Sequence, residues 1–158
     1  MKQAPGWHVL NRGIAGERSD QILARFPALL ETLKPDLVIV LAGVNDLYQG
    51  RPAGAVKANL TRIYDLAARR RIRTAACSIL PYNTASSEIL ARMDDVNRWI
   101  EKECRSRGMI YCDTYRLMDN PERPGTLQGS PDGAHPSPGG YRKMGEYLAE
   151  TLKKYITD

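Results

Sequence analysis

The stretch Leu37–Asp46 reads LVIVLAGVND and passes directly from an apolar run to two polar side chains. Its first part, Leu37–Gly43, is apolar on both faces, which is typical of a buried strand in a parallel sheet. Asn45 and Asp46 follow at the carboxyl end of that strand, where open α/β sheets bind their ligands. The stretch therefore predicts a parallel sheet with polar groups at its carboxyl edge.

Three further runs favour strands, because they are short and rich in β-branched, aromatic or other apolar residues: Trp7–Gly13, Thr74–Leu80 and Met109–Tyr115. The segments between them carry apolar residues three and four positions apart, as helices do. The predicted helices are Gln21–Leu33 with Ser19 as its cap and Pro27 kinking or dividing it, Pro52–Arg70, Ser87–Arg107 stopped by Gly108, and a last helix beginning near Pro138.

The repeating apolar positions indicate which face of each helix is buried. They are Ile22, Leu29, Leu30 and Leu33; Val56, Leu60, Ile63 and Ala67; Ile89, Met93, Val96 and Ile100; and Tyr141, Met144, Leu148 and Leu152. Strands alternating with helices predict an α/β fold, a three-layer α/β/α arrangement with a flavodoxin-like parallel sheet and helices on both faces. The length of 158 residues fits a single domain over residues 1–158.

Composition narrows the class of protein. No run approaches the eighteen apolar residues of a membrane span, and the first ten residues lack the apolar segment of a secretory signal, so we expect a cytoplasmic protein. The three cysteines, Cys77, Cys104 and Cys112, have no metal-site spacing and are expected to be reduced and buried. The basic cluster Arg69–Arg73 lies where a helix should end, which favours a role at the helix dipole over nucleic-acid binding.

Three of the loops that follow predicted strands carry groups suited to acyl transfer. The first, NRGIAGE, contains Gly16 before a helix, where backbone N–H groups point outward. The second offers the Asn45 amide, and the third holds Asp132 and His135 three residues apart. Two N–H donors could hold an oxyanion, and an Asp-oriented His is a general base. Each part alone is also compatible with an ordinary turn or helix cap.

Together these motifs resemble the SGNH, or GDSL-type, hydrolase superfamily: NRGIAGE its second block, LVIVLAGVNDL its third and PDGAHPSPGGY its fifth. The resemblance implies a carboxylic ester hydrolase that uses no metal or cofactor. It assigns His135 as base, Asp132 as its partner, and Gly16 and Asn45 as oxyanion donors. Glu17 stands where many relatives have Asp. Substrates would be acyl esters such as acetylated sugars, lysophospholipids or short-chain aryl esters.

The Gly-Asp-Ser block that carries the family's nucleophile is missing from the sequence. Six serines are poor replacements, because they lie inside a predicted strand, in capping positions or too near His135 in the chain: Ser19, Ser78, Ser86, Ser87, Ser130 and Ser137. In the family, the strand of that block lies centrally, between the strands corresponding to Trp7–Asn11 and Leu37–Ala42. We therefore expect a domain truncated at its N-terminus relative to the family and inactive by itself. Alternatively, the strands close up, or a homo-oligomer or a donated strand covers the gap.

Two other functions remain open from the residues alone. One is a non-catalytic pseudoenzyme or binding module on the same scaffold. The other is metal-dependent phosphoester hydrolysis with Asp46, Asp132 and His135 as ligands. Three candidate ligands without a second histidine make this hypothesis weaker. The loop Pro81–Glu88, with Tyr82 and Asn83, follows a strand and is either part of the site or an ordinary connection.

Overall fold

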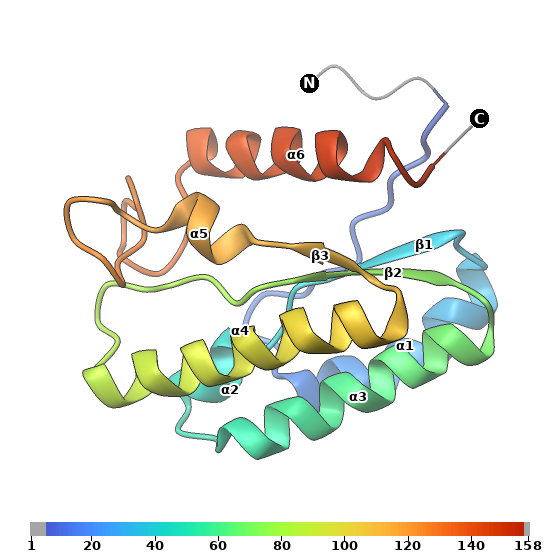
Figure 1. Ribbon diagram of the computed structural model, residues 1–158, viewed down its shortest axis with the longest axis horizontal. Helices are drawn as coiled ribbons and strands as arrows, with labels where there is room; N and C mark the ends of the chain where they lie inside the picture. Colours follow the sequence, from blue (N-terminus) through green and yellow to red (C-terminus); the bar gives the residue numbers. More distant parts are fainter. Residues whose placement is uncertain (1–5, 157–158) are drawn as a thin grey trace.

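A computed structural model of the chain describes residues 6–156 and shows a parallel sheet between layers of helices (Figure 1). The strands β1 (Leu37–Val40), β2 (Arg73–Cys77) and β3 (Ile110–Cys112) lie in the order β1-β2-β3. Both pairs are parallel, with Val40 opposite Ala76 and Cys77 opposite Cys112. The predicted α/β class is confirmed, and the strand that follows each crossover helix lies next to the previous one.

Helices cover both faces of the sheet (Figure 1). On one face lie α1 (Ser19–Leu33), α3 (Ala53–Arg69) and α4 (Ser87–Arg107), and on the other lies α6 (Pro138–Leu152). Successive residues of β2 alternate between the two layers: Ala76 belongs to the larger apolar cluster, whereas Ala75 and Cys77 pack in the cluster that includes Leu152 of α6. Two short helices, α2 (Val44–Tyr48) and α5 (Thr114–Met118), follow β1 and β3 at the carboxyl edge.

Most of the predicted apolar faces form the core. The predicted positions that are buried are Leu30 in α1; Val56, Leu60, Ile63 and Ala67 in α3; Met93, Val96 and Ile100 in α4; and Met144 and Leu152 in α6. The bounds of α4 are those predicted, and Gly108 ends the helix in the left-handed conformation at φ 66°. The three cysteines are buried and unpaired. None of the helices among residues 6–156 is long and apolar enough to span a bilayer.

Two details of the predicted helices are wrong, the cap of α1 and the burial of Tyr141. Ser19 does not cap α1 but lies in its first turn; Arg18 occupies the cap position, and its backbone N–H donates to Gln21 Oε1 at 3.0 Å. Of the two effects predicted for Pro27, division of the helix does not occur: α1 continues through Pro27, and Phe26 and Leu30 on either side are buried in the core. Tyr141 is exposed rather than buried.

The predicted strand at Trp7–Gly13 does not form. Residues 7–13 are irregular, and no backbone–backbone hydrogen bond ties them to any described strand. Side-chain contacts hold the segment instead: Trp7 packs in the cluster that contains Leu37, and Arg25 Nη2 donates to Arg12 O at 2.8 Å. A strand needs a neighbour to satisfy its backbone groups, and β1, β2 and β3 form no hydrogen-bonded ladder with this segment.

β1 is an edge strand with apolar side chains in solvent. It pairs only with β2, so its other edge has no partner strand among the described residues. All exposed large aliphatic side chains of residues 6–156 belong to β1, the residue next to it and residues 9–14: Val9, Leu10, Ile14, Ile39 and Leu41. Monomeric proteins rarely leave such groups of apolar side chains and such edges uncovered.

Candidate active site

The loop before α1 presents Gly16 at the surface. Gly16 is exposed and adopts φ 80°, a left-handed conformation that a residue with a side chain rarely takes. The neighbouring Glu17 carboxylate is held by Arg25, with 2.6 Å between Glu17 Oε2 and Arg25 Nη2. This ion pair fixes the loop from the side of α1, so the carboxylate that stands in place of the family's Asp already has a structural partner.

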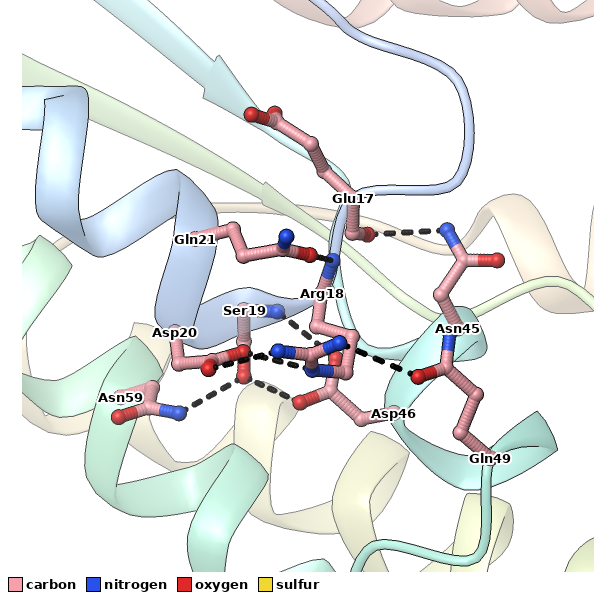
Figure 2. Close-up of polar contacts among 9 residues, drawn as sticks. All are labelled: Glu17, Arg18, Ser19, Asp20, Gln21, Asn45, Asp46, Gln49 and Asn59. Carbon is pink, nitrogen blue, oxygen red and sulfur yellow. Dashed lines mark hydrogen bonds and ion pairs between the residues drawn. The ribbon is translucent and has the colours of Figure 1, made fainter.

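Asn45 lies against the same loop. Its Nδ2 donates to the Glu17 carbonyl oxygen at 2.9 Å, as Figure 2 shows. Asn45 thus contacts the residue directly after Gly16, and the two predicted oxyanion donors lie on adjoining elements. The preceding Gly43 makes this position of α2 possible: at φ 117° its missing Cβ would lie 2.7 Å from Ile79 and 2.9 Å from Val56.

Asp46 is buried and fastens α2 to the first turn of α1. Its carboxylate accepts the Ser19 backbone N–H at 2.8 Å and the Ser19 hydroxyl at 2.7 Å. Asn59 of α3 in turn donates to Ser19 Oγ at 2.9 Å (Figure 2). Nothing near Asn59 in the sequence marks it for this role, and Ser19 was predicted only as a cap. Ser19 instead donates to a buried carboxylate, as burial of a charge requires, and Asn59 donates to the Ser19 hydroxyl.

The predicted pair Asp132 and His135 is in direct contact. His135 Nδ1 lies 2.7 Å from Asp132 Oδ2, while Asp132 Oδ1 accepts the backbone N–H groups of Ala134 and His135 at 2.9 and 2.8 Å. One carboxylate oxygen therefore shapes the loop, and the other orients the imidazole. Both side chains are open to solvent, 52% and 66% exposed.

This loop is anchored to the loop that follows β2. The backbone N–H of Asn83 donates to Gly133 O at 2.7 Å, and Asn83 Oδ1 accepts from the Leu127 backbone N–H at 2.8 Å. Gly133, at φ 78°, packs against the Asn83 side chain where a Cβ would be 3.1 Å away. Pro81–Glu88 is therefore more than a connection, since it positions the loop that carries Asp132 and His135.

We expect the Asp132 carboxylate to stay ionised in unusually acidic solution. The N–H of Ala134, the His135 side chain and the His135 N–H all lower the pKa of Asp132 well below its ordinary value of about 3.9. A carboxyl whose pKa is lowered on folding stabilises the folded state above its ordinary pKa. That contribution is lost only as the pH falls through the lowered value.

The amide proton shifts of Ala134 and His135 report this titration, because both groups donate to Asp132. They should remain constant as the pH falls through 4, which is about the ordinary aspartate pKa, and change only at lower pH. The Asp132→Asn variant should lack that transition. A transition centred near the ordinary pKa would contradict the assigned contacts.

Other predicted partners are not brought together. Asp46 is buried with Ser19, and no group of three His, Cys, Asp or Glu side chains able to hold a metal occurs among residues 6–156. The proposed phosphoesterase ligand set of Asp46, Asp132 and His135 therefore does not assemble. Among residues 6–156, the only hydrogen bond of the His135 ring is with Asp132. The nearby Ser130 does not bond the ring, since its Oγ donates to the His135 backbone oxygen at 2.6 Å.

The fold, an α/β arrangement with a parallel sheet, and these motifs together define a protein of the SGNH hydrolase class. The family model of the GDSL-like lipases and acylhydrolases matches residues 1–143, and the chain belongs to this family. Similar curated proteins are esterases. The chain is 30% identical over 155 residues to the esterase TesA of Pseudomonas aeruginosa, covering 95% of this chain and 72% of TesA. It is 26% identical over 149 residues to an arylesterase of Vibrio mimicus, covering 94% of this chain and 71% of the arylesterase.

Solved structures agree with the family. A GDSL-like lipase from Bacteroides thetaiotaomicron superposes with a TM-score of 0.85 at 25% identity, covering 92% of this chain and 75% of the lipase. A putative lipolytic protein from Desulfitobacterium hafniense superposes with a TM-score of 0.79 at 21% identity, covering 90% of this chain and 80% of that protein, which shows the shared fold.

Proposed function

We propose that these residues form the base and oxyanion parts of a serine-type carboxylic ester hydrolase that acts through an acyl-enzyme. The observation that carries the proposal is the 2.7 Å contact between His135 Nδ1 and Asp132, with the other carboxylate oxygen bound to the loop backbone. This arrangement keeps the proton on Nδ1 and leaves the Nε2 lone pair to act as a base.

In this mechanism His135 Nε2 takes the proton of a serine hydroxyl as the oxygen attacks the ester carbonyl. Asp132 stabilises the imidazolium that forms. The imidazolium then returns the proton to the leaving alcohol as the ester C–O bond breaks. Water, deprotonated by the same nitrogen, hydrolyses the acyl-enzyme and regenerates the serine. No metal is needed at any step.

Gly16 and Asn45 are the proposed oxyanion donors. One N–H of the Asn45 amide is used by Glu17 O, and the second is available for the oxygen that becomes negative at the ester carbonyl. The backbone N–H of Gly16 comes from the adjoining loop, where its left-handed conformation and exposure allow close approach by a ligand. Losing one such donor costs a factor of about a hundred to a thousand in kcat.

The nucleophile is proposed to come from polypeptide outside these 158 residues, since no serine hydroxyl of the described residues bonds the His135 ring. The uncovered edge of β1 suggests how it enters. A strand added parallel to β1, from a longer product of the gene or from another chain, would end at the carboxyl edge beside Asn45. The same strand would cover Ile39 and Leu41.

The proposal is tested by comparing two proteins. One is the 158-residue chain, and the other is extended by whatever in-frame codons precede Met1 in the gene. The extended protein should hydrolyse p-nitrophenyl acetate and should be labelled on one serine by a fluorophosphonate probe, whereas the 158-residue chain should do neither. An extended protein that carries a new serine strand and cleaves no short acyl ester would overturn the proposal.

The alternative is a binding protein on the same scaffold, which the exposure of His135 and its lack of a serine partner among residues 6–156 favour. A stop codon directly before Met1, with no hydrolysis in the presence of the cell's other proteins, would support it. Acetylated sugars, lysophospholipids and short-chain aryl esters are the candidate ligands in either case. The relatives named esterase and arylesterase support the ester class.

A further inference from the structure

We propose that Tyr48 and Tyr82 form an aromatic wall of the site that binds the flat, apolar part of the ester. This inference rests on the proposed function and narrows its substrate class to esters with an aryl or similarly planar group. It adds two residues to the site, neither of which takes part in proton transfer or in holding the oxyanion.

Tyr48 lies on the same side of α2 as the proposed oxyanion donor. It is the last residue of the helix, three positions after Asn45, and residues three apart project from one side of a helix. Its side chain is 65% exposed, which is unusual for a ring that gains much by burial. An exposed ring one turn from Asn45 can cover an apolar group whose carbonyl oxygen points at that amide.

Tyr82 holds the Tyr48 ring in place. The two ring centroids lie 5.6 Å apart with an interplanar angle of 67°, the edge-to-face geometry that aromatic pairs prefer. Tyr82 itself is only 3% exposed, so it forms a fixed support. An exposed side chain that is already held in position loses little freedom when a ligand binds, and its contact area is therefore more effective.

The ring of Tyr82, and not its hydroxyl, carries this role. The hydroxyl is buried and has no hydrogen-bond partner among the described residues. A buried hydroxyl without a partner destabilises the fold. The hydroxyl of Tyr82 therefore does not explain a tyrosine at this position, and phenylalanine should be tolerated there. Burial raises the pKa of Tyr82, which therefore stays uncharged beside Tyr48 at neutral pH.

The same loop connects the aromatic pair to the base. Asn83, the next residue, donates its backbone N–H to Gly133 O at 2.7 Å, one residue after Asp132. The aromatic pair therefore lies between the two proposed parts of the site. Asn45, an oxyanion donor, precedes Tyr48 on α2, and the loop that carries Asp132 and His135 is bonded to the residue after Tyr82. A ligand whose carbonyl lies between those parts has the aromatic pair as its neighbouring apolar surface.

The inference is tested by binding of two ketones that cannot be hydrolysed, acetophenone and butanone, to the 158-residue chain. Both present an acetyl carbonyl, but only acetophenone has a ring. Protein-detected NMR titrations should give a dissociation constant for acetophenone that rises about two- to tenfold in Tyr48→Ala, the range expected for an aromatic pair. Tyr48→Phe and Tyr82→Phe should bind as the original chain does. Butanone binding should not change in any variant.

Tyr141→Ala is the matched control, because Tyr141 is also exposed, at 55%, but lies on α6. The inference is overturned if acetophenone does not bind the original chain, if Tyr48→Ala binds it equally well, or if Tyr141→Ala loses as much affinity. Because the ketones do not react, Tyr48-dependent binding without any ester hydrolysis would retain the wall and reject the enzyme. Hydrolysis without Tyr48-dependent binding would do the reverse.

Discussion

Replacing His135 by alanine should lower kcat/KM for p-nitrophenyl acetate about a hundred- to ten-thousandfold in the extended protein that supplies the serine nucleophile. Among the described residues, the imidazole is the only group in contact with Asp132 that could accept the proton of a serine hydroxyl. Its loss removes both the base for attack and the acid for departure of the alcohol. The measurement is steady-state hydrolysis at neutral pH, corrected for the reaction of the ester with buffer alone.

Two variants make this result specific. The sequence holds only one other histidine, the exposed His8, so His8→Ala controls for direct attack of an imidazole on the ester and should keep full activity. Asp132→Asn retains an oxygen able to accept the Ala134 and His135 N–H groups but loses the charge that stabilises the imidazolium. It should lose activity while the loop keeps its shape. Equal activity in His135→Ala and His8→Ala would show that His135 is not the base.

Asp46→Ala should lower the free energy of unfolding by about 3 kcal/mol. The Asp46 carboxylate accepts two hydrogen bonds from Ser19, and all of these groups are buried. Alanine leaves both donors without a partner and opens the connection between α1 and α2. For a domain whose total stability is typically about 5–15 kcal/mol, the loss is large. Urea denaturation followed by circular dichroism measures it.

Asp20→Ala is the control for this variant, because Asp20 lies one residue from Ser19 but is exposed and forms a surface ion pair with Arg18. Its midpoint of denaturation should change little. Asp46→Asn should fall between the two, since an amide keeps one acceptor oxygen for Ser19. If Asp46→Ala denatures at the same urea concentration as Asp20→Ala, then the buried network does not hold α1 to α2.

The sequence was sufficient for elements with strong local signals. The period of α4 runs unbroken from Met93 to Ile100, and Gly108 supplies the left-handed stop, so its bounds could be predicted. The contact between Asp132 and His135 could also be anticipated, because three residues in a turn keep the two side chains close. These features depend on residues near one another in the chain.

Features that depend on distant residues were predicted wrongly or missed. Trp7–Gly13 has the composition of a strand, but pairing requires a neighbour that the described residues do not provide. Ser19 has the ordinary signature of a cap, yet its hydroxyl donates a hydrogen bond to a carboxylate 27 positions away in the chain. The aromatic pair is similar, since nothing in the sequence near Tyr48 shows that Tyr82 lies beside it.

The edge position of β1 has a consequence for how the sheet opens. In a parallel strand alternate peptide groups point to opposite sides, so half of those in β1 face away from β2 and toward water. Amide protons on that side have no strand to protect them from exchange with solvent. β2, paired on both sides, is the part of the sheet best protected. Within the sheet, local opening should therefore begin at β1, the strand that leads into Asn45.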